Sequence, residues 1–150
     1  MSTTDRIEKS IVLRAPRRQV WRALTDVAEF GAWFGIALQG PFAAGHAVAG
    51  VFTRAGHAPV TLTFYVEAIE PEHRFVYRWH PFAVDPAVDY SAEPTTTCTF
   101  TLADDGTGTR LTIVEAGFDA LPAGRRDEAF RMNTRGWEAQ LRNVGTHVGG

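Results

Sequence analysis

The sequence predicts an α+β fold in which a curved antiparallel sheet of about six strands wraps around one long C-terminal helix, with two short helices after the first strand. Two observations carry this prediction. In most of the chain, apolar and polar residues alternate in runs bounded by turn signals, whereas the last segment repeats its apolar residues at helical spacing. With 150 residues and 45% hydrophobic content, the chain suits one domain with a buried core, placed at residues 1–150.

The first strand and the two short helices are expected near the N-terminus. Residues 6–16, RIEKSIVLRAP, alternate as a strand does. Pro16 suits the first turn of a helix, where its missing N–H costs nothing, and Thr25 and Asp26 are good caps for a second helix. The apolar residues of the two helices are Val20, Trp21, Ala23 and Leu24, and then Phe30, Trp33 and Phe34.

Five further strands and the long helix follow. A strand is expected around Val48 to Arg54, then in residues 60–70 and in residues 73–82, HRFVYRWHPF. Residues 95–118 indicate a hairpin of two strands around the turn DDGTG. In residues 60–70 the residues expected on the inner face are Leu62, Phe64, Val66 and Ala68. The helix, from about Pro122 to Val148, has an apolar stripe of Phe130, Trp137, Leu141, Val144 and Val148.

Composition argues against several classes of function. A formal net charge of −2 provides no electrostatic surface for nucleic acid or for an anionic membrane. Cys98 is the only cysteine, which excludes an intrachain disulfide and a cysteine-based zinc site, and its strand position favours a buried, inert thiol. The histidines lack metal-ligand spacing, and no cofactor fingerprint is present. No apolar run reaches the roughly 18 residues of a membrane span, and we expect a cytoplasmic protein without cofactor or metal.

The stretch HRFVYRWHPF places Phe75, Tyr77 and Trp79 on one strand face. For any one of them a filled core is the simpler interpretation, but an aromatic wall with a few polar groups is also typical of small-molecule sites. Tyr77 and Trp79 carry polar atoms that need partners when buried. The residues expected to line a cavity between the sheet and the helix are Trp33, Phe34, Phe52, Phe64, Phe75, Tyr77, Trp79, Phe100, Ile113, Glu115, Phe130, Asn133 and Trp137.

Glu115 is the candidate for chemistry. It shares strand parity with Leu111 and Ile113, so its carboxylate is expected to point inward, where a lone charge is costly. It is either a general acid/base or ligand partner, or the carboxylate of an ion pair with Arg131 or Arg135.

Three residues of the long helix leave further alternatives open. Asn133 and Thr134 interrupt the apolar stripe, so they either face a cavity or form local hydrogen bonds. Gly136 costs about 1 kcal/mol relative to alanine inside a helix. It therefore indicates either a close approach to the sheet or room for a ligand.

Several blocks of the sequence carry a family resemblance. IVLRAPRRQVWRALTD, AWF, VEAIEPEHRFVYRWH, CTFTLADDGTGTRLTIVEAGF and GWEAQLRNV occur in order over most of the chain. They resemble the activators of the ninety-kilodalton heat-shock-protein ATPase, which in bacteria belong to the helix-grip superfamily of START-like and birch-pollen-allergen-like (SRPBCC) proteins. The resemblance implies a helix-grip fold with an internal cavity. The chain departs from the family pattern in residues 81–94, PFAVDPAVDYSAEP, a long connection of the kind that forms lids or binding loops.

Three functions are compatible with these features. The first is the binding of a small hydrophobic or aromatic ligand in the internal cavity. The second is a protein-interaction role, either as a homodimer or in a co-chaperone-like stress response. The third is an enzyme of the cyclase or hydratase type, with Glu115 as acid/base and Tyr77 or Asn133 orienting the substrate. We favour the first and expect the protein not to be an enzyme.

Overall fold

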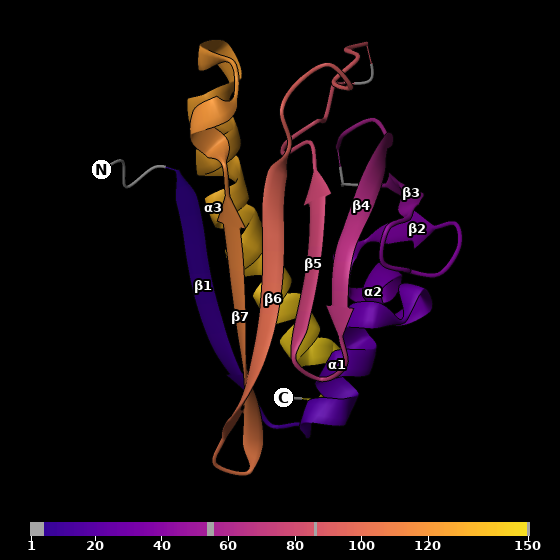
Figure 1. Cartoon of the computed structure of the whole chain (residues 1–150), viewed down its shortest axis with the longest axis vertical. Coiled ribbons are helices and arrows are strands. Elements are labelled where there is room, and N and C mark those ends of the chain that lie inside the picture. Colours follow the sequence, from indigo (N-terminus) through magenta and orange to yellow (C-terminus); the bar gives the residue numbers. More distant parts are fainter. Residues whose placement is uncertain (1–4, 54–55, 86, 150) are drawn as a thin grey trace.

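A computed structural model describes residues 5–53, 56–85 and 87–149 of the chain. Its seven strands form one antiparallel sheet in the order β1-β7-β6-β5-β4-β3-β2. The three α-helices pack on one face of this sheet, behind the strands in Figure 1. This arrangement confirms the predicted helix-grip fold. The strands are β1 (Arg6–Leu13), β2 (Ile36–Leu38), β3 (Ala47–Phe52), β4 (Val60–Glu70), β5 (Arg74–Trp79), β6 (Thr96–Asp105) and β7 (Gly108–Ala116).

The helices form where their capping residues predict. They are α1 (Arg17–Thr25), α2 (Val27–Phe34) and α3 (Ala123–His147), with one 3-10 turn, η1 (Phe118–Ala120). Asp26 caps α2, since its Oδ1 accepts the backbone N–H groups of Ala28 at 2.9 Å and Glu29 at 3.1 Å. Pro16 is the N-cap of α1 and lies just before its first turn.

The sheet differs from the prediction in two places. The short strand β2 was not foreseen, because its three residues are too few to show alternation. A bulge between Val66 and Ala68 in β4 reverses the alternation beyond it. Ala68 is therefore paired with outward-facing Val76, and Ile69 with Phe75, so the inward orientation expected for Ala68 was wrong. Arg54, the expected end of the β3 strand, lies outside the described residues.

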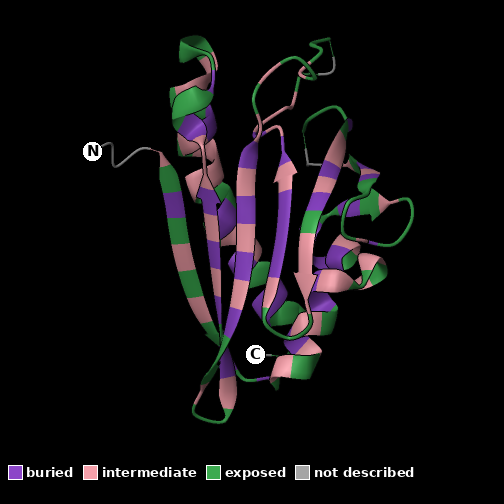
Figure 2. Cartoon of the chain, viewed as in Figure 1, coloured by how far each residue is buried: buried purple, intermediate pink, exposed green. Residues whose placement is uncertain are grey.

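The core is an aromatic layer between the sheet and the helices. Figure 2 shows that β5 is buried over most of its length, whereas in the edge strand β1 exposed residues alternate with buried or half-buried ones. Phe64, Phe75 and Tyr77 have no exposed surface. Their rings contact one another, with centroids 4.8 Å apart for Phe64 and Tyr77 and 5.6 Å apart for Phe75 and Tyr77. The interior around these three residues is therefore filled with packed rings.

Candidate ligand-binding site

A pocket opens at the end of the core where β5 leaves the sheet. It measures about 140 Å³ and lies between β5, the start of the β5–β6 connection and α3. In Figure 1 this is the upper end of the molecule, where the connection rises above β5 and β6. The lining residues are Phe34, Phe52, Leu62, Trp79, His80, Phe82, Ala83, Val84, Met132, Asn133, Gly136, Trp137 and Gln140.

The structure brings only part of the predicted cavity lining to this pocket. The predicted residues that line it are Phe34, Phe52, Trp79, Asn133 and Trp137. The predicted residues that lie elsewhere are Trp33, Phe64, Phe75, Tyr77, Phe100, Ile113, Glu115 and Phe130. Most of these are fully buried in the ring-packed core, and Phe130 packs against Phe118, with ring centroids 5.3 Å apart. The three aromatics of β5 are therefore not one continuous wall: only Trp79 reaches the pocket.

The remaining lining residues were not among those predicted to line the cavity, although room for a ligand is one of the two explanations that the sequence offers for Gly136. Met132, Gly136 and Gln140 follow one another at intervals of four along α3, so they share a helix face beside the apolar stripe. Phe82, Ala83 and Val84 come from the apolar start of the β5–β6 connection. These two signals are present in the sequence, but only the fold places one against the other.

Gly136 decides one of the alternatives left open by the sequence. A Cβ atom built on it would meet no heavy atom within 4 Å. Close approach to the sheet is therefore excluded as the reason for the glycine. Its position in the lining agrees with the second explanation, room for a ligand.

Glu115 lies directly behind the pocket wall, with no exposed surface. One carboxylate oxygen, Oε2, accepts hydrogen bonds from Trp79 Nε1 at 2.7 Å and Thr96 Oγ1 at 2.5 Å. The other, Oε1, accepts from Asn133 Nδ2 at 3.0 Å and Trp137 Nε1 at 2.8 Å. The inward orientation expected for Glu115 is therefore observed. The suggested ion pair with Arg131 or Arg135 is not, because four neutral side chains from β5, β6 and α3 donate to the carboxylate instead.

The groups around Glu115 suit a hydrogen-bond acceptor. A carboxylate is an acceptor only, with about four lone-pair sites, and an indole N–H can only donate. The neighbouring acids respond to this environment. Burial raises the pKa of Cys98 well above its ordinary value, and the negative charge of Glu115 raises it further. Burial also raises the pKa of Tyr77, with smaller contributions from Cys98 and Glu115.

Among the described residues, Tyr77 is the exception to the rule that buried polar side-chain atoms have good hydrogen-bond partners. Its hydroxyl is buried and forms no hydrogen bond among the described residues beyond a weak interaction with the Cys98 thiol. A thiol is a weak partner, so the hydroxyl carries much of its desolvation cost uncompensated. Tyr77 therefore does not line the pocket, and it forms no direct hydrogen bond with Glu115.

The β5–β6 connection, residues 81–94, is held to α3 by Arg125. The guanidinium donates to the carbonyl oxygens of Pro81 at 2.8 Å and Phe82 at 3.0 Å. It also pairs with Glu93 at 2.8 Å and stacks over the Tyr90 ring at 4.6 Å from the centroid. Phe82 has a left-handed backbone, φ 50°, which is uncommon for a bulky residue. The predicted lid or binding loop is thus tied down over the pocket by one side chain.

A second, more polar hollow adjoins the pocket. It measures about 240 Å³ and lies between the outer side of β4 and the β5–β6 connection. Leu62, Trp79, His80 and Ala83 border both spaces. Its other lining residues are Thr61, Thr63, Tyr65, Val88, Asp89, Tyr90 and Ser91.

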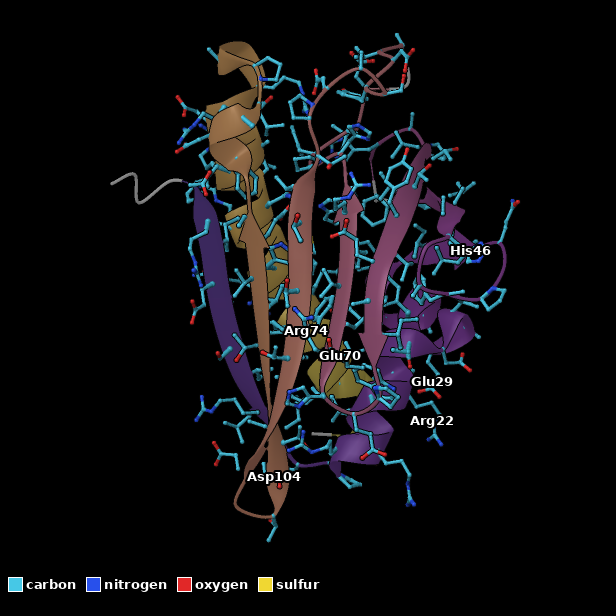
Figure 3. The ribbon with its side chains drawn as sticks, in the orientation of Figure 1. Arg22, Glu29, His46, Glu70, Arg74 and Asp104 are labelled. Carbon is cyan, nitrogen blue, oxygen red and sulfur yellow. The ribbon has the colours of Figure 1, made fainter. Side chains whose placement is uncertain are left out.

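Two surface ion pairs lie away from the pocket. The ion pairs Arg22–Glu29, at 2.7 Å, and Glu70–Arg74, at 2.7 Å, lie toward the end opposite the β5–β6 connection (Figure 3). Within the described part of the chain, no cluster of three or more histidine, cysteine or carboxylate side chains could hold a metal ion. In the same residues, no helix combines the length and apolar character needed to cross a membrane.

Comparison with known proteins finds a family model that matches most of the chain. The family model described as Activator of Hsp90 ATPase homolog 1-like protein matches residues 14–149. A search of the curated proteins finds no match.

Solved structures share the fold at low sequence identity. Protein CV1439 from Chromobacterium violaceum matches over 97% of this chain and 98% of its own chain, with 23% identity and a TM-score of 0.75. The Aha1 dimer from Colwellia psychrerythraea matches over 95% of both chains, with 15% identity and a TM-score of 0.71. DynU16, from the dynemicin biosynthetic locus, matches over 95% of this chain, with 21% identity and a TM-score of 0.73, but the match spans only 46% of DynU16.

Proposed function

The chain belongs to the family of Activator of Hsp90 ATPase homolog 1-like proteins, and from that premise we propose that it binds one small apolar or aromatic group in the pocket between β5 and α3. The observation that supports this proposal is an open, ring-lined space in an interior that is otherwise closely packed. Gly136 supports it further, since alanine would give a more stable helix and nothing in the fold excludes a side chain there.

The volume limits the size of the bound group. Sites for drug-sized ligands measure about 300–1,000 Å³, and an engineered cavity of about 150 Å³ binds benzene. A pocket of about 140 Å³ therefore suits one ring or a branched group of similar size. A longer ligand has to extend past the β5–β6 connection.

Benzyl alcohol tests this function, because it combines one ring with good solubility. The indole N–H signals of Trp79 and Trp137 in proton–nitrogen NMR spectra are expected to shift on titration, since both indoles line the pocket. The signal of Trp33 is the internal reference, because its indole N–H is bound to the carbonyl oxygen of Ala23 at 2.8 Å, away from the pocket. Equal shifts at all three indoles, or none, contradict the proposal.

A matched pair of variants locates the binding. Gly136→Leu fills the pocket from α3 and is expected to abolish the benzyl alcohol shifts without lowering the melting temperature. Gly124→Leu is the control, because Gly124 is also an open position of α3 but lies outside the lining. Its shifts should equal those of the wild type.

The two other hypotheses have less support. A homodimer or co-chaperone-like role draws on one fold neighbour, which is a dimer in solution. An enzyme role draws on a neighbour from a biosynthetic locus. For this chain, however, Glu115 is sealed by four donors, whereas a general acid/base must reach the proton that it transfers. We keep the cytoplasm as the proposed compartment, since the free, buried Cys98 fits reducing conditions.

A further inference from the structure

A buried negative charge without a cationic partner is unusual in a protein of this size. Glu115 has no exposed surface, and none of the ion pairs formed by the described residues includes it. Burial of a carboxylate is costly unless hydrogen bonds and an opposite charge compensate for it. Here the hydrogen bonds are complete, but the charge is not neutralised.

The charge lies one side chain away from the pocket. Three of its four donors, Trp79, Asn133 and Trp137, also line the pocket. The two indoles approach the carboxylate with their N–H edges and approach each other with ring centroids 5.8 Å apart. The negative charge is therefore behind the wall, and the wall itself is aromatic.

An aromatic wall of this kind attracts cations. The faces of tryptophan, tyrosine and phenylalanine draw a cation that lies within about 6 Å of the ring centroid, and tryptophan does so most strongly. Donation of an indole N–H to a carboxylate polarises the ring further in the same direction. The aromatic residues in the lining are Phe34, Phe52, Trp79, Phe82 and Trp137.

We propose that the pocket takes a compact alkylammonium group, such as a trimethylammonium head, whose positive charge compensates Glu115 across the indoles of Trp79 and Trp137. This inference rests on the proposed function, since it names the chemical class of the group that enters the same pocket. A methylated ammonium has an apolar surface, so it also suits a lining that is mainly carbon. Its size fits a space of about 140 Å³.

The basic residues near the rim of the pocket do not cancel the attraction of a cation to Glu115 and the two indoles. Arg125 is paired with Glu93 at 2.8 Å, so its charge is locally neutralised. His80 is engaged at Nε2, which donates to the carbonyl oxygen of Glu93 at 3.1 Å. The charge that faces the pocket from within the core is that of Glu115.

A pair of isosteric ligands isolates the effect of the charge. Choline and 3,3-dimethyl-1-butanol have the same shape, but a quaternary nitrogen in the first replaces a carbon atom in the second. We expect choline to bind at least tenfold more tightly to the wild-type protein, measured by the Trp79 and Trp137 indole shifts at matched ionic strength. A ratio below tenfold overturns the inference, and this outcome needs no variant.

Two substitutions in the carboxylate network then test the source of the preference. Glu115→Gln keeps the size of the side chain but removes its charge, so the choline preference should fall at least tenfold. Thr96→Val is the control, because it removes one donor to Glu115 from a residue outside the pocket lining and keeps the charge. The preference should survive in that variant. A preference that persists in Glu115→Gln, or that disappears equally in Thr96→Val, also overturns the inference.

The same measurements distinguish a failure of this inference from a failure of the proposed function. If benzyl alcohol and the neutral isostere bind while choline does not, only the assignment of a cation fails. If none of the three ligands shifts the pocket indoles, the proposed function fails as well.

Discussion

The two ends of strand β5 differ although they present the same kind of residue to the same face. At the lower end, Phe75 packs against Phe42 and Phe100, with ring centroids 5.0 and 6.2 Å apart, and has no exposed surface. At the upper end, Trp79 packs against Trp137 but also borders an open pocket. The aromatic character of a strand face therefore does not decide between a core and a binding site. What decides is whether the opposite element fills the space.

The filling elements explain the difference. The sealed end receives rings from neighbouring strands and from the segments before β3, including Phe42 and Phe64. The open end faces α3 where that helix carries Gly136, which contributes no side chain. The two ends of β5 thus differ in the side chains that lie opposite them, and Gly136 leaves room at the open end.

The largest expected contrast is between truncations of the two ends. Phe75→Ala leaves a cavity in the sealed end, and we expect a loss of about 3–5 kcal/mol in the free energy of unfolding. Phe52→Ala, at the half-buried rim of the pocket, should cost only about 1–2 kcal/mol, because it widens a space that is already open. Urea unfolding measures both. Equal losses would show that the two ends are packed alike and would remove the basis of the comparison.

The distinction between the two ends was only partly available from the sequence. Alternation with a period of two correctly turns Phe75, Tyr77 and Trp79 inward, and it also turns Glu115 inward. It fails at Ala68, since a bulge is a local change of register that leaves no mark in the pattern. The donors to Glu115 come from β5, β6 and α3, so only the fold brings them together.

The second prediction uses pH to probe the sealed end. Burial raises the pKa of Cys98 above its ordinary value of 9.0 and that of Tyr77 above 10.0. Above these ordinary values the unfolded chain loses protons that the folded chain keeps. The free energy of unfolding should therefore fall as pH rises, by about 1.4 kcal/mol per pH unit for each group. Below the ordinary value of Cys98 neither group should contribute a slope.

Variants assign this slope to the two residues. Cys98→Ala should remove the part that begins near pH 9.0, and Tyr77→Phe the part that begins near pH 10.0. Tyr77→Phe should also leave stability at pH 7 unchanged or slightly raised, because the lost hydroxyl has only a weak partner. Tyr65→Phe, on the outer face of β4, is the control. Urea unfolding from pH 7 to 10.5 provides the curves, and an unchanged slope in Cys98→Ala contradicts the assignment.

The smallest effect on global stability is expected at the open end, where Arg125 holds the β5–β6 connection. Arg125→Gln loses the ion pair with Glu93 and most of the contacts to Pro81 and Phe82. Since these contacts join one surface connection to one helix turn, their loss should raise local opening and leave the packed core intact. We expect less than about 1 kcal/mol of change in global unfolding.

Proteolysis reports that local opening directly. Chymotrypsin cleaves after aromatic residues, and the connection contains Phe82 and Tyr90. When cleavage follows the population of the open form, each kcal/mol of lost local stability speeds it about fivefold. Arg125→Gln should therefore be cut several times faster within the connection, whereas Arg131→Gln, an exposed arginine of the same helix, should behave as the wild type. Equal cleavage rates would mean that the connection is held by its own internal hydrogen bonds, and that the pocket is covered without the help of α3.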